Sequence, residues 1–146
     1  PDAVLRVVGR GGDALGSLAR TEGVEMLGRV DDVQVELDRA DVAIVPIRVG
    51  AGTRLKVIEA LANRLPMVTT TVGCEGIDVT DGHTALIADD PVGFAGAVLR
   101  LVADGGLRQA LGDAGSDLSE QRYTWAAIQD GVEALARSTA GTSRSR

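Results

Sequence analysis

Residues 46–76 read PIRVGAGTRLKVIEALANRLPMVTTTVGCEG, and this segment contains the pattern that decides the fold. It continues the unbroken apolar run VAIVP at residues 42–46, which is typical of a strand buried on both faces of a parallel sheet. A glycine loop follows, then apolar residues at helical spacing in residues 55–62, ended by Pro66. The β-branched run MVTTT then predicts a further strand. This order of elements predicts a strand-helix-strand unit with a parallel sheet.

Further apolar runs of strand length lie outside this segment. Residues 4–8 and 24–27 precede it, and residues 84–88 follow it. Strands that alternate with helices predict an α/β fold, here a Rossmann-like parallel sheet with helices on both faces. Ligands bind such sheets beyond the carboxyl ends of the strands. We therefore expect the loops that follow the strands to carry the function.

Helices are expected between the strands and throughout the C-terminal part. Asp13 is placed to cap a helix that runs to about Arg20, and Asp31 or Asp32 to cap a short helix. Phe94 and Trp125 are expected to pack the C-terminal helices. The helical C-terminal segment is predicted over residues 92–103, 107–118 and 125–136.

Length and composition set the limits of the function. A chain of 146 residues is enough for one domain, which we place at residues 1–137, with a disordered polar tail at residues 138–146. The net charge of −6 argues against a nucleic-acid partner. No apolar run reaches the roughly 18 residues of a membrane span, and a single cysteine, Cys74, excludes an internal disulfide framework. The abrupt start at Pro1 leads us to expect a piece of a longer polypeptide.

The glycine loop after residues 42–46 has the composition of an anion site. Gly50 and Gly52 allow the backbone to approach a ligand closely, and Thr53 is placed to cap the following helix. The N-terminus of that helix presents unpaired N–H groups and the positive end of its dipole, which suits a phosphate. The alternative is a tight turn between strand and helix with solvated charges.

Charged residues surround this loop. Arg48 flanks it, and Arg54 and Lys56 lie in the expected first helical turn, where a bound anion would compensate their charge. Glu59 follows three residues after Lys56, on the same helix face. It either forms an ion pair with Lys56 or accepts hydrogen bonds from the hydroxyl groups of a ribose.

The segment as a whole resembles the signature of the retaining glycosyltransferase family 4, also called the group 1 glycosyltransferases. That signature reads approximately Pro-x-x-x-Gly-x-Gly, Lys-x-x-Glu-Ala-x-Ala, a Pro-Val-Val-x-Thr strand and Gly-x-Glu-Gly. A weaker match extends from the strand that ends at Gly9, through residues 27–30, to Tyr123-x-Trp125. The ordered set of motifs carries the resemblance.

The resemblance implies the C-terminal, donor-binding half of a GT-B fold. The implied activity is transfer of a hexosyl group from a nucleotide diphosphate sugar to a glycan, lipid or small molecule, with retained anomeric configuration. No cofactor or metal is expected. The implied partners are the sugar donor and an N-terminal acceptor domain, which this chain lacks together with its own first strand. The isolated domain is then expected to be inactive, with exposed apolar surface that favours a homodimer.

The resemblance also assigns residues to the donor site. Glu59 matches the second Glu of the family's Glu-x7-Glu motif, which binds the ribose. Ala51 stands where the first Glu would contact the donor sugar, which leaves the identity of the sugar open. No residue is identified as catalytic. The expected donor-binding residues are Gly50, Ala51, Gly52, Thr53, Lys56 and Glu59, with Gly28, Arg29 and Val30 against the nucleobase.

Two other classes of function compete with this interpretation. Gly9-x-Gly11-x-x-Ala14 after a strand satisfies a minimal dinucleotide fingerprint, with Asp31 or Asp32 as the acidic residue. This pattern would suit an NAD(P)-binding oxidoreductase domain. A non-catalytic α/β module is the third class. A receiver domain is disfavoured, because the residues after the third strand are Pro-Ile-Arg rather than acidic.

Three further residues near the predicted site are interpreted as structural. His83 belongs to an expected surface turn, Cys74 has no metal-binding partner at ligand spacing, and Glu75 is expected to support its loop. The expected localisation is cytoplasmic, at the inner face of the membrane if the full-length enzyme is peripheral.

Overall fold

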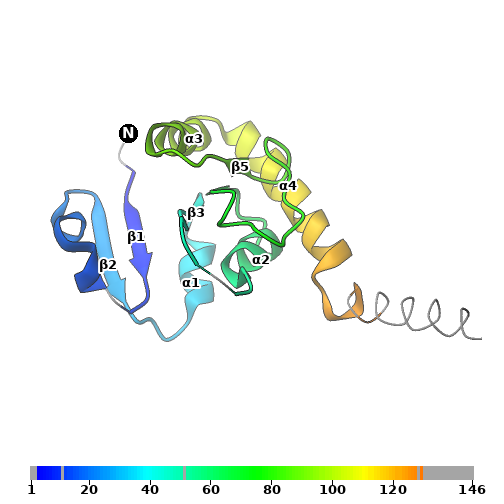
Figure 1. Ribbon diagram of the computed structural model, residues 1–146, viewed down its shortest axis with the longest axis horizontal. Helices are drawn as coiled ribbons and strands as arrows, with labels where there is room; N and C mark the ends of the chain where they lie inside the picture. The colour runs from blue at the N-terminus through cyan, green and yellow to red at the C-terminus, as the bar shows by residue number, and fades with distance from the viewer. Residues whose placement is uncertain (1–2, 11, 51, 128, 130–146) are drawn as a thin grey trace, which may run out of the picture. The chain divides into compact units, whose positions relative to one another are not determined.

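A computed structural model describes residues 3–10, 12–50, 52–127 and 129, except for the side chains of residues 12–14. The chain divides into two compact units, Pro1–Ala40 and Asp41–Arg146. Both units contain parallel strands and helices (Figure 1). The expected α/β class is therefore confirmed.

The first unit is built on two parallel strands, β1 (Leu5–Val8) and β2 (Val24–Gly28), which lie where the apolar runs predict them. Between them lies η1 (Gly12–Arg20), a 3-10 helix that is interrupted at Gly16, where φ is 55°. The prediction of a regular helix here is wrong in type, because a left-handed residue interrupts the helical hydrogen bonds. The cap predicted at Asp13 lies outside the described side chains.

Helix α1 (Val33–Asp38) completes this unit. The carboxylate of Asp32 accepts a hydrogen bond from the backbone N–H of Gln34 at 2.8 Å, so Asp32 is the N-cap of the two candidates. The guanidinium of Arg6 on β1 forms an ion pair with Glu36. This pair connects the helix to the strand.

The second unit contains a three-stranded parallel sheet in the order β3-β4-β5. The strands are β3 (Ala43–Val45), β4 (Met67–Thr69) and β5 (Leu86–Ile87). All three residues of β4 are buried, whereas Ile44 in β3 is 36% exposed. Burial on both faces, expected for residues 42–46, is therefore found in β4 instead.

Three helices pack around this sheet, and Figure 1 shows α2 and α3 on different sides of its strands. Helix α3 begins after Asp90, whose carboxylate accepts hydrogen bonds from two backbone N–H groups of the first turn. Asp104 caps the next helix by accepting one hydrogen bond, from the Leu107 N–H at 2.9 Å. Helices on both sides of the strands and a helical C-terminal segment are thus confirmed. The helices are α2 (Leu55–Ala62), α3 (Pro91–Ala103) and α4 (Gly105–Arg122).

The core of this unit lies between β4, β5, α3 and α4. Phe94 packs against it, as expected. Trp125 does not, because it is 87% exposed, so the prediction that it packs the C-terminal helices is wrong for the described structure. Most of the helix expected over residues 125–136 lies outside the described residues. The buried residues of this part of the core are Val68, Leu86, Leu101 and Leu111, and Val57, Leu61 and Met67 of the same unit are also fully buried.

Helix α2 ends before Pro66, by a backbone motif rather than by the proline. The Leu65 N–H donates to the carbonyl of Ala60 at 3.0 Å, and the Arg64 N–H donates to that of Leu61 at 3.0 Å. This pair of bonds is the Schellman motif, which places the residue after the cap in the left-handed region. Arg64 occupies that position with φ of 53°.

Helix α4 approaches the end of α2 very closely. A Cβ added to Gly112 would overlap the carbonyl oxygen of Arg64, and one added to Gly115 would lie 2.9 Å from Leu61 Cδ2. Both glycines are buried. The two helices therefore pack through backbone contact at these positions.

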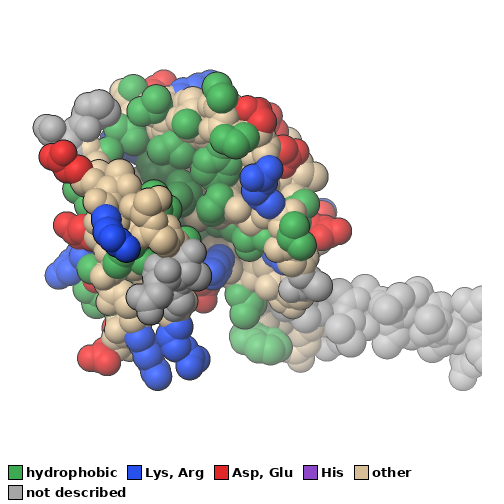
Figure 2. All heavy atoms as spheres, turned by 60° about the vertical axis from the view of Figure 1, so that its left-hand side comes forward, with side chains coloured by type: hydrophobic (Ala, Val, Ile, Leu, Met, Phe, Trp, Pro, Cys, Tyr) green, Lys and Arg blue, Asp and Glu red, His purple; other side chains and the backbone are tan. Residues whose placement is uncertain are grey.

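The surface carries mixed charges and exposed apolar side chains (Figure 2). On the face shown there, basic side chains are dispersed among acidic ones. Exposed apolar residues of the second unit include Val49, Val92 and Leu99. Within the described residues, no helix has the length and apolar character required to cross a membrane.

Candidate functional site

The candidate site lies at the carboxyl ends of β3 and β4, where two loops meet. The Thr70 hydroxyl donates to the carbonyl of Ile47 and accepts from the N–H of Gly73 at 2.8 Å. A Cβ at Gly73 would lie 2.7 Å from the carbonyl oxygen of Val45 and would also overlap a threonine hydroxyl. Glycine is therefore required there for the loop after β4 to pack against the loop after β3.

The glycine loop after β3 leads directly into α2. Gly52 has φ of 102°, in the region that favours glycine. Ala51 lies outside the described residues. The prediction that Thr53 caps the helix is wrong, because Arg54 occupies the cap position and no side chain there caps the helix. The cap residue gives the first N–H groups of α2 no side-chain partner, and those of Leu55 and Val57 donate instead to the carbonyls of Thr53 and Arg54, both at 2.9 Å. The positive end of the helix dipole favours an anion at this point.

Arg54 is the residue of this site that sequence reasoning left without a role. The sequence predicted a cation in the first helical turn, but Arg54 is the cap residue of the helix. Its side chain is buried, at 6% exposure. Its Nη2 donates to the Gly50 carbonyl at 2.9 Å and lies 3.4 Å from Oε2 of Glu75. Burial was not predictable here, because Arg54 precedes the helix and belongs to no periodic pattern. This contact joins Glu75 to the loop after β3, and the role expected for Glu75 in supporting its loop stays a prediction.

Lys56 and Glu59 are exposed on α2. No ion pair joins them in the part of the chain that the structure describes, so the intrahelical pair is not formed. Glu59 lies five residues beyond the cap Arg54, which corresponds to roughly 7.5 Å along the helix axis. Its carboxylate is thus available to a ligand that extends along α2 from the glycine loop.

The predicted nucleobase segment belongs to the first unit. Gly28 ends β2 with φ of 66°, and its carbonyl accepts a hydrogen bond from the Gly9 N–H at 2.7 Å. Arg29 is exposed and Val30 is partly buried. These three residues therefore form a turn at the carboxyl end of a strand, as a ligand-binding role requires.

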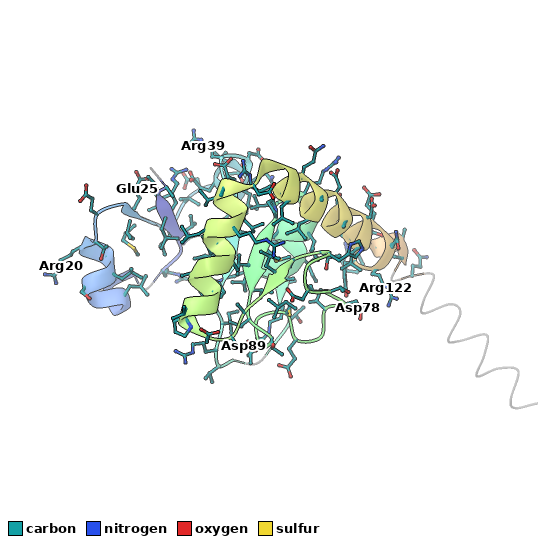
Figure 3. All side chains as sticks on the ribbon, turned by 90° about the horizontal axis from the view of Figure 1, so that it is seen from above. Arg20, Glu25, Arg39, Asp78, Asp89 and Arg122 are labelled. Carbon is teal, nitrogen blue, oxygen red and sulfur yellow. The ribbon has the colours of Figure 1, made fainter. Side chains whose placement is uncertain are left out.

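The end of α4 anchors the loop that follows β4. The Asp78 N–H donates to the Tyr123 hydroxyl at 2.8 Å, and the Asp78 carboxylate pairs with Arg122 at 2.8 Å. Figure 3 shows Asp78 and Arg122 next to each other. Tyr123, which carries part of the resemblance, is thus placed as a structural residue of this loop.

A second carboxylate lies after β5. Asp89 accepts hydrogen bonds from the backbone N–H and the hydroxyl of Thr71, both at 2.8 Å. These bonds favour the charged form and lower the pKa of Asp89. Asp89 thereby joins the loops after β4 and β5.

The remaining candidates near the site have structural environments. His83 is exposed in a turn, as expected. Cys74 is buried, and burial raises the pKa of its thiol. The described residues contain no group of three or more His, Cys, Asp or Glu that could hold a metal ion, and the expectation of a metal-independent site stays a prediction.

The dinucleotide fingerprint is not supported by the local structure. Its glycines should lead into a regular helix whose N-terminus binds a pyrophosphate. Instead they lead into η1, which is interrupted at Gly16. Gly11 lies outside the described residues.

Sequence comparisons identify relatives of one family. The family described as glycosyl transferases group 1 matches residues 1–104. An uncharacterized glycosyltransferase of Methanocaldococcus jannaschii is 30% identical over 113 residues, which are 75% of this chain and 32% of that protein. An uncharacterized 44.6 kDa protein in the cps region of Klebsiella pneumoniae is 35% identical over 65 residues, which are 44% of this chain and 17% of that protein. The chain spans at most about a third of the length of these relatives.

Two solved structures illustrate the fold that this chain shares with other proteins. Sucrose-phosphate synthase of Thermosynechococcus elongatus is 25% identical with a TM-score of 0.73, over 89% of this chain and 34% of that chain. HepE of Anabaena in complex with UDP is 17% identical with a TM-score of 0.80, over 94% of this chain and 42% of that chain. The nicotinamide alternative is not favoured by these relatives. The match over residues 1–104, supported by the shared GT-B type of fold, shows that this chain belongs to the group 1 glycosyltransferases.

Proposed function

We propose that this chain is the donor-binding, C-terminal domain of a retaining glycosyltransferase. It binds a nucleotide diphosphate sugar and contributes to the transfer of a hexosyl group to an acceptor held by a second, N-terminal domain. The activity belongs to the whole enzyme, and the chain by itself binds the donor without transferring the sugar.

The observation that carries this proposal is the anion site at the N-terminus of α2. The loop after β3 reaches the helix through Gly52, whose left-handed conformation exposes the backbone. The loop after β4 is fixed against it by Thr70 and Gly73. The open glycine backbone of the loop and the positive end of the helix dipole at this point favour a diphosphate.

The position of Glu59 extends the site from the diphosphate towards a nucleoside. A carboxylate accepts hydrogen bonds from both hydroxyls of a ribose, and a separation of roughly 7.5 Å along α2 suits a ribose joined to a diphosphate at the helix N-terminus. The structure of HepE contains UDP, which supports a nucleoside diphosphate as the ligand of this fold.

The proposed chemistry follows from the charge of the leaving group. Transfer releases a nucleoside diphosphate. Hydrogen-bond donors oriented towards the diphosphate stabilise the charge that develops on it. A retaining reaction of this kind is proposed to draw its base from the donor's own phosphate. Ala51, at the position of the family's sugar-contacting Glu, leaves the choice of sugar to other residues.

Nucleotide binding tests this proposal. The thermal stability of the chain is measured with UDP, GDP, ADP and NAD, and the affinity of the best ligand is then measured by calorimetry. Glu59→Ala is expected to weaken a nucleoside diphosphate about tenfold or more, because hydrogen bonds to a charged group are lost. Glu120→Ala, at an exposed glutamate of α4, is the matched control. Stabilisation by NAD alone, or an unchanged affinity in Glu59→Ala, would contradict the proposal.

A further inference from the structure

The guanidinium of Arg54 is a buried cation with an incomplete set of partners. The side chain is 6% exposed, yet Glu75, the carboxylate beside it, is 73% exposed. Their contact is long, at 3.4 Å, and the other partner is the neutral carbonyl of Gly50. The Nε of Arg54 is buried and has no hydrogen-bond partner among the residues that the structure describes. Arginine stays charged in proteins, so this charge is only partly compensated.

A buried charge without full compensation is unfavourable and is seldom retained without a partner. Glu75 is a poor partner here, because a carboxylate that is mostly in water keeps its hydration and binds weakly across a surface contact. The arrangement therefore leaves Arg54 able to gain a stronger anionic partner.

The location of Arg54 defines which anion could reach it. It is the cap residue of α2, so its side chain begins at the positive end of the helix dipole. Its Nη1 would lie 3.7 Å from a Cβ at position 50, so the glycine places no side chain of its own between the guanidinium and the loop backbone. An anion bound to the loop would thus lie beside both the helix N-terminus and the guanidinium.

We propose that Arg54 is the cationic contact for the diphosphate of the donor, and that Glu75 occupies this contact until the ligand replaces it. This inference rests on the proposed function. Binding exchanges the Glu75 carboxylate for a phosphate oxygen on Arg54 and releases Glu75 to solvent. Glu75 is then an internal competitor, which sets how tightly the diphosphate binds.

A purely structural role for the pair makes the opposite prediction. If Arg54 and Glu75 only hold the two loops together, removing the Glu75 charge loosens the site and weakens or does not change anion binding. If Glu75 competes with the ligand, removing its charge strengthens anion binding. The two roles therefore differ in the sign of one measurement.

The experiment measures the binding of inorganic pyrophosphate and of UDP to the 146-residue chain by calorimetry. Glu75→Gln keeps the shape of the side chain and is expected to tighten pyrophosphate about threefold or more, in keeping with the loss of an exposed competing ion pair. Glu120→Gln removes the same charge from α4 and is expected to change the affinity less than twofold. Circular dichroism melting checks that each variant is folded.

The second measurement observes Arg54 directly. The Nε–H signal of Arg54 in a nitrogen-15 NMR spectrum is expected to shift when pyrophosphate is added, in the wild type and in Glu75→Gln. The Arg54→Gln variant identifies this signal by its loss. When Arg54→Gln is combined with Glu75→Gln, we expect the gain in pyrophosphate affinity caused by Glu75→Gln to disappear. If Arg54 only held the two loops together and did not contact the ligand, the position of this signal would not change.

The outcomes separate this inference from the proposed function. Tighter binding of pyrophosphate by Glu75→Gln supports the inference, whatever the result with UDP. If UDP binds no more tightly than pyrophosphate, that result counts against the nucleotide site and leaves the inference about Arg54 and Glu75 unaffected. Equal or weaker binding of pyrophosphate by Glu75→Gln overturns the inference even if UDP binds well. Absence of pyrophosphate binding in both proteins overturns it as well.

Discussion

At the scale of single residues, Arg64 stands out because it adopts the left-handed conformation that a Schellman motif requires. A side chain with a Cβ is strained there by about 1–2 kcal/mol. Arg64 also forms an ion pair with Asp113 on α4. Its side chain is mostly exposed, so the pair contributes little to stability.

Replacing Arg64 separates these two effects. Arg64→Ala loses the ion pair and keeps the strain, whereas Arg64→Gly loses both. We expect the glycine variant to have a free energy of unfolding about 1 kcal/mol higher than that of the alanine variant. Urea unfolding followed by circular dichroism measures the difference, and equal midpoints would show that the conformation is not strained.

Asp89 makes the stability of the fold depend on pH. Its pKa is lowered in the folded state by two hydrogen bonds from Thr71. A depressed carboxylate pKa stabilises the fold above the unfolded value of about 3.9, and this stabilisation is lost as the pH falls through the lower, folded value.

We therefore expect Asp89→Asn to remove part of the loss of stability in acid. The melting temperature of the wild type should fall more steeply than that of Asp89→Asn between neutral pH and about pH 3. Asp117→Asn, at an exposed carboxylate that accepts no hydrogen bond within the described residues, is the control. Parallel melting curves for wild type and Asp89→Asn would rule out this role of Asp89.

At the scale of elements, the packing of α4 against α2 depends on a missing side chain. A Cβ at Gly112 would meet the backbone of Arg64, which has no alternative rotamer to adopt. Gly112→Ala is expected to lower the free energy of unfolding by about 1–3 kcal/mol, because the helices must separate. Gly96→Ala in α3 adds the same methyl group where, among the described residues, no atom beyond the neighbouring helix backbone lies within 4 Å, and it is expected to stabilise by about 0.5–1 kcal/mol. Urea unfolding of both variants tests this contrast. A similar change in the free energy of unfolding for Gly112→Ala and Gly96→Ala would refute it.

The order of elements was predictable because each one has a local signal. The apolar runs predicted the strands, and the aspartate pair before residue 33 predicted one of the caps, which the structure places at Asp32. The interruption of η1 at Gly16 was not predictable, because a glycine has no side chain to place in a pattern. The exposure of Trp125 was not predictable either, because hydrophobicity alone does not show where a packing partner ends.

The site was predictable in its location and less so in its contacts. Glycines after a strand and before a helix indicated the anion loop, and the structure places Gly52 and the start of α2 as that pattern requires. The cap at Thr53 was wrong, because the chain enters α2 one residue later. The contact between Arg54 and Glu75 spans 21 residues, a distance at which single-sequence patterns carry no information about contacts.

At the scale of the whole molecule, exposed apolar residues lead us to expect self-association. Val92 is 83% and Leu99 is 56% exposed, and their spacing places both on one face of α3. Light scattering is expected to show a mass that rises with concentration towards a dimer, and Val92→Lys with Leu99→Lys should lower that mass. Gln109→Lys with Asp117→Asn adds the same charge on α4 as a control. A monomer at high concentration would contradict this expectation.

The anchoring of the loop after β4 also has a consequence for the order in which the site forms. One end of the loop is held by Thr70, three residues from its partner Gly73, and can form as soon as β4 does. The other end is held through Asp78 by Tyr123, which lies 45 residues later in the chain. Contacts of such separation form slowly and late in folding. On the ribosome, this end of the loop can be fixed only after Tyr123 has been synthesised, so binding competence is acquired well after β4 has formed.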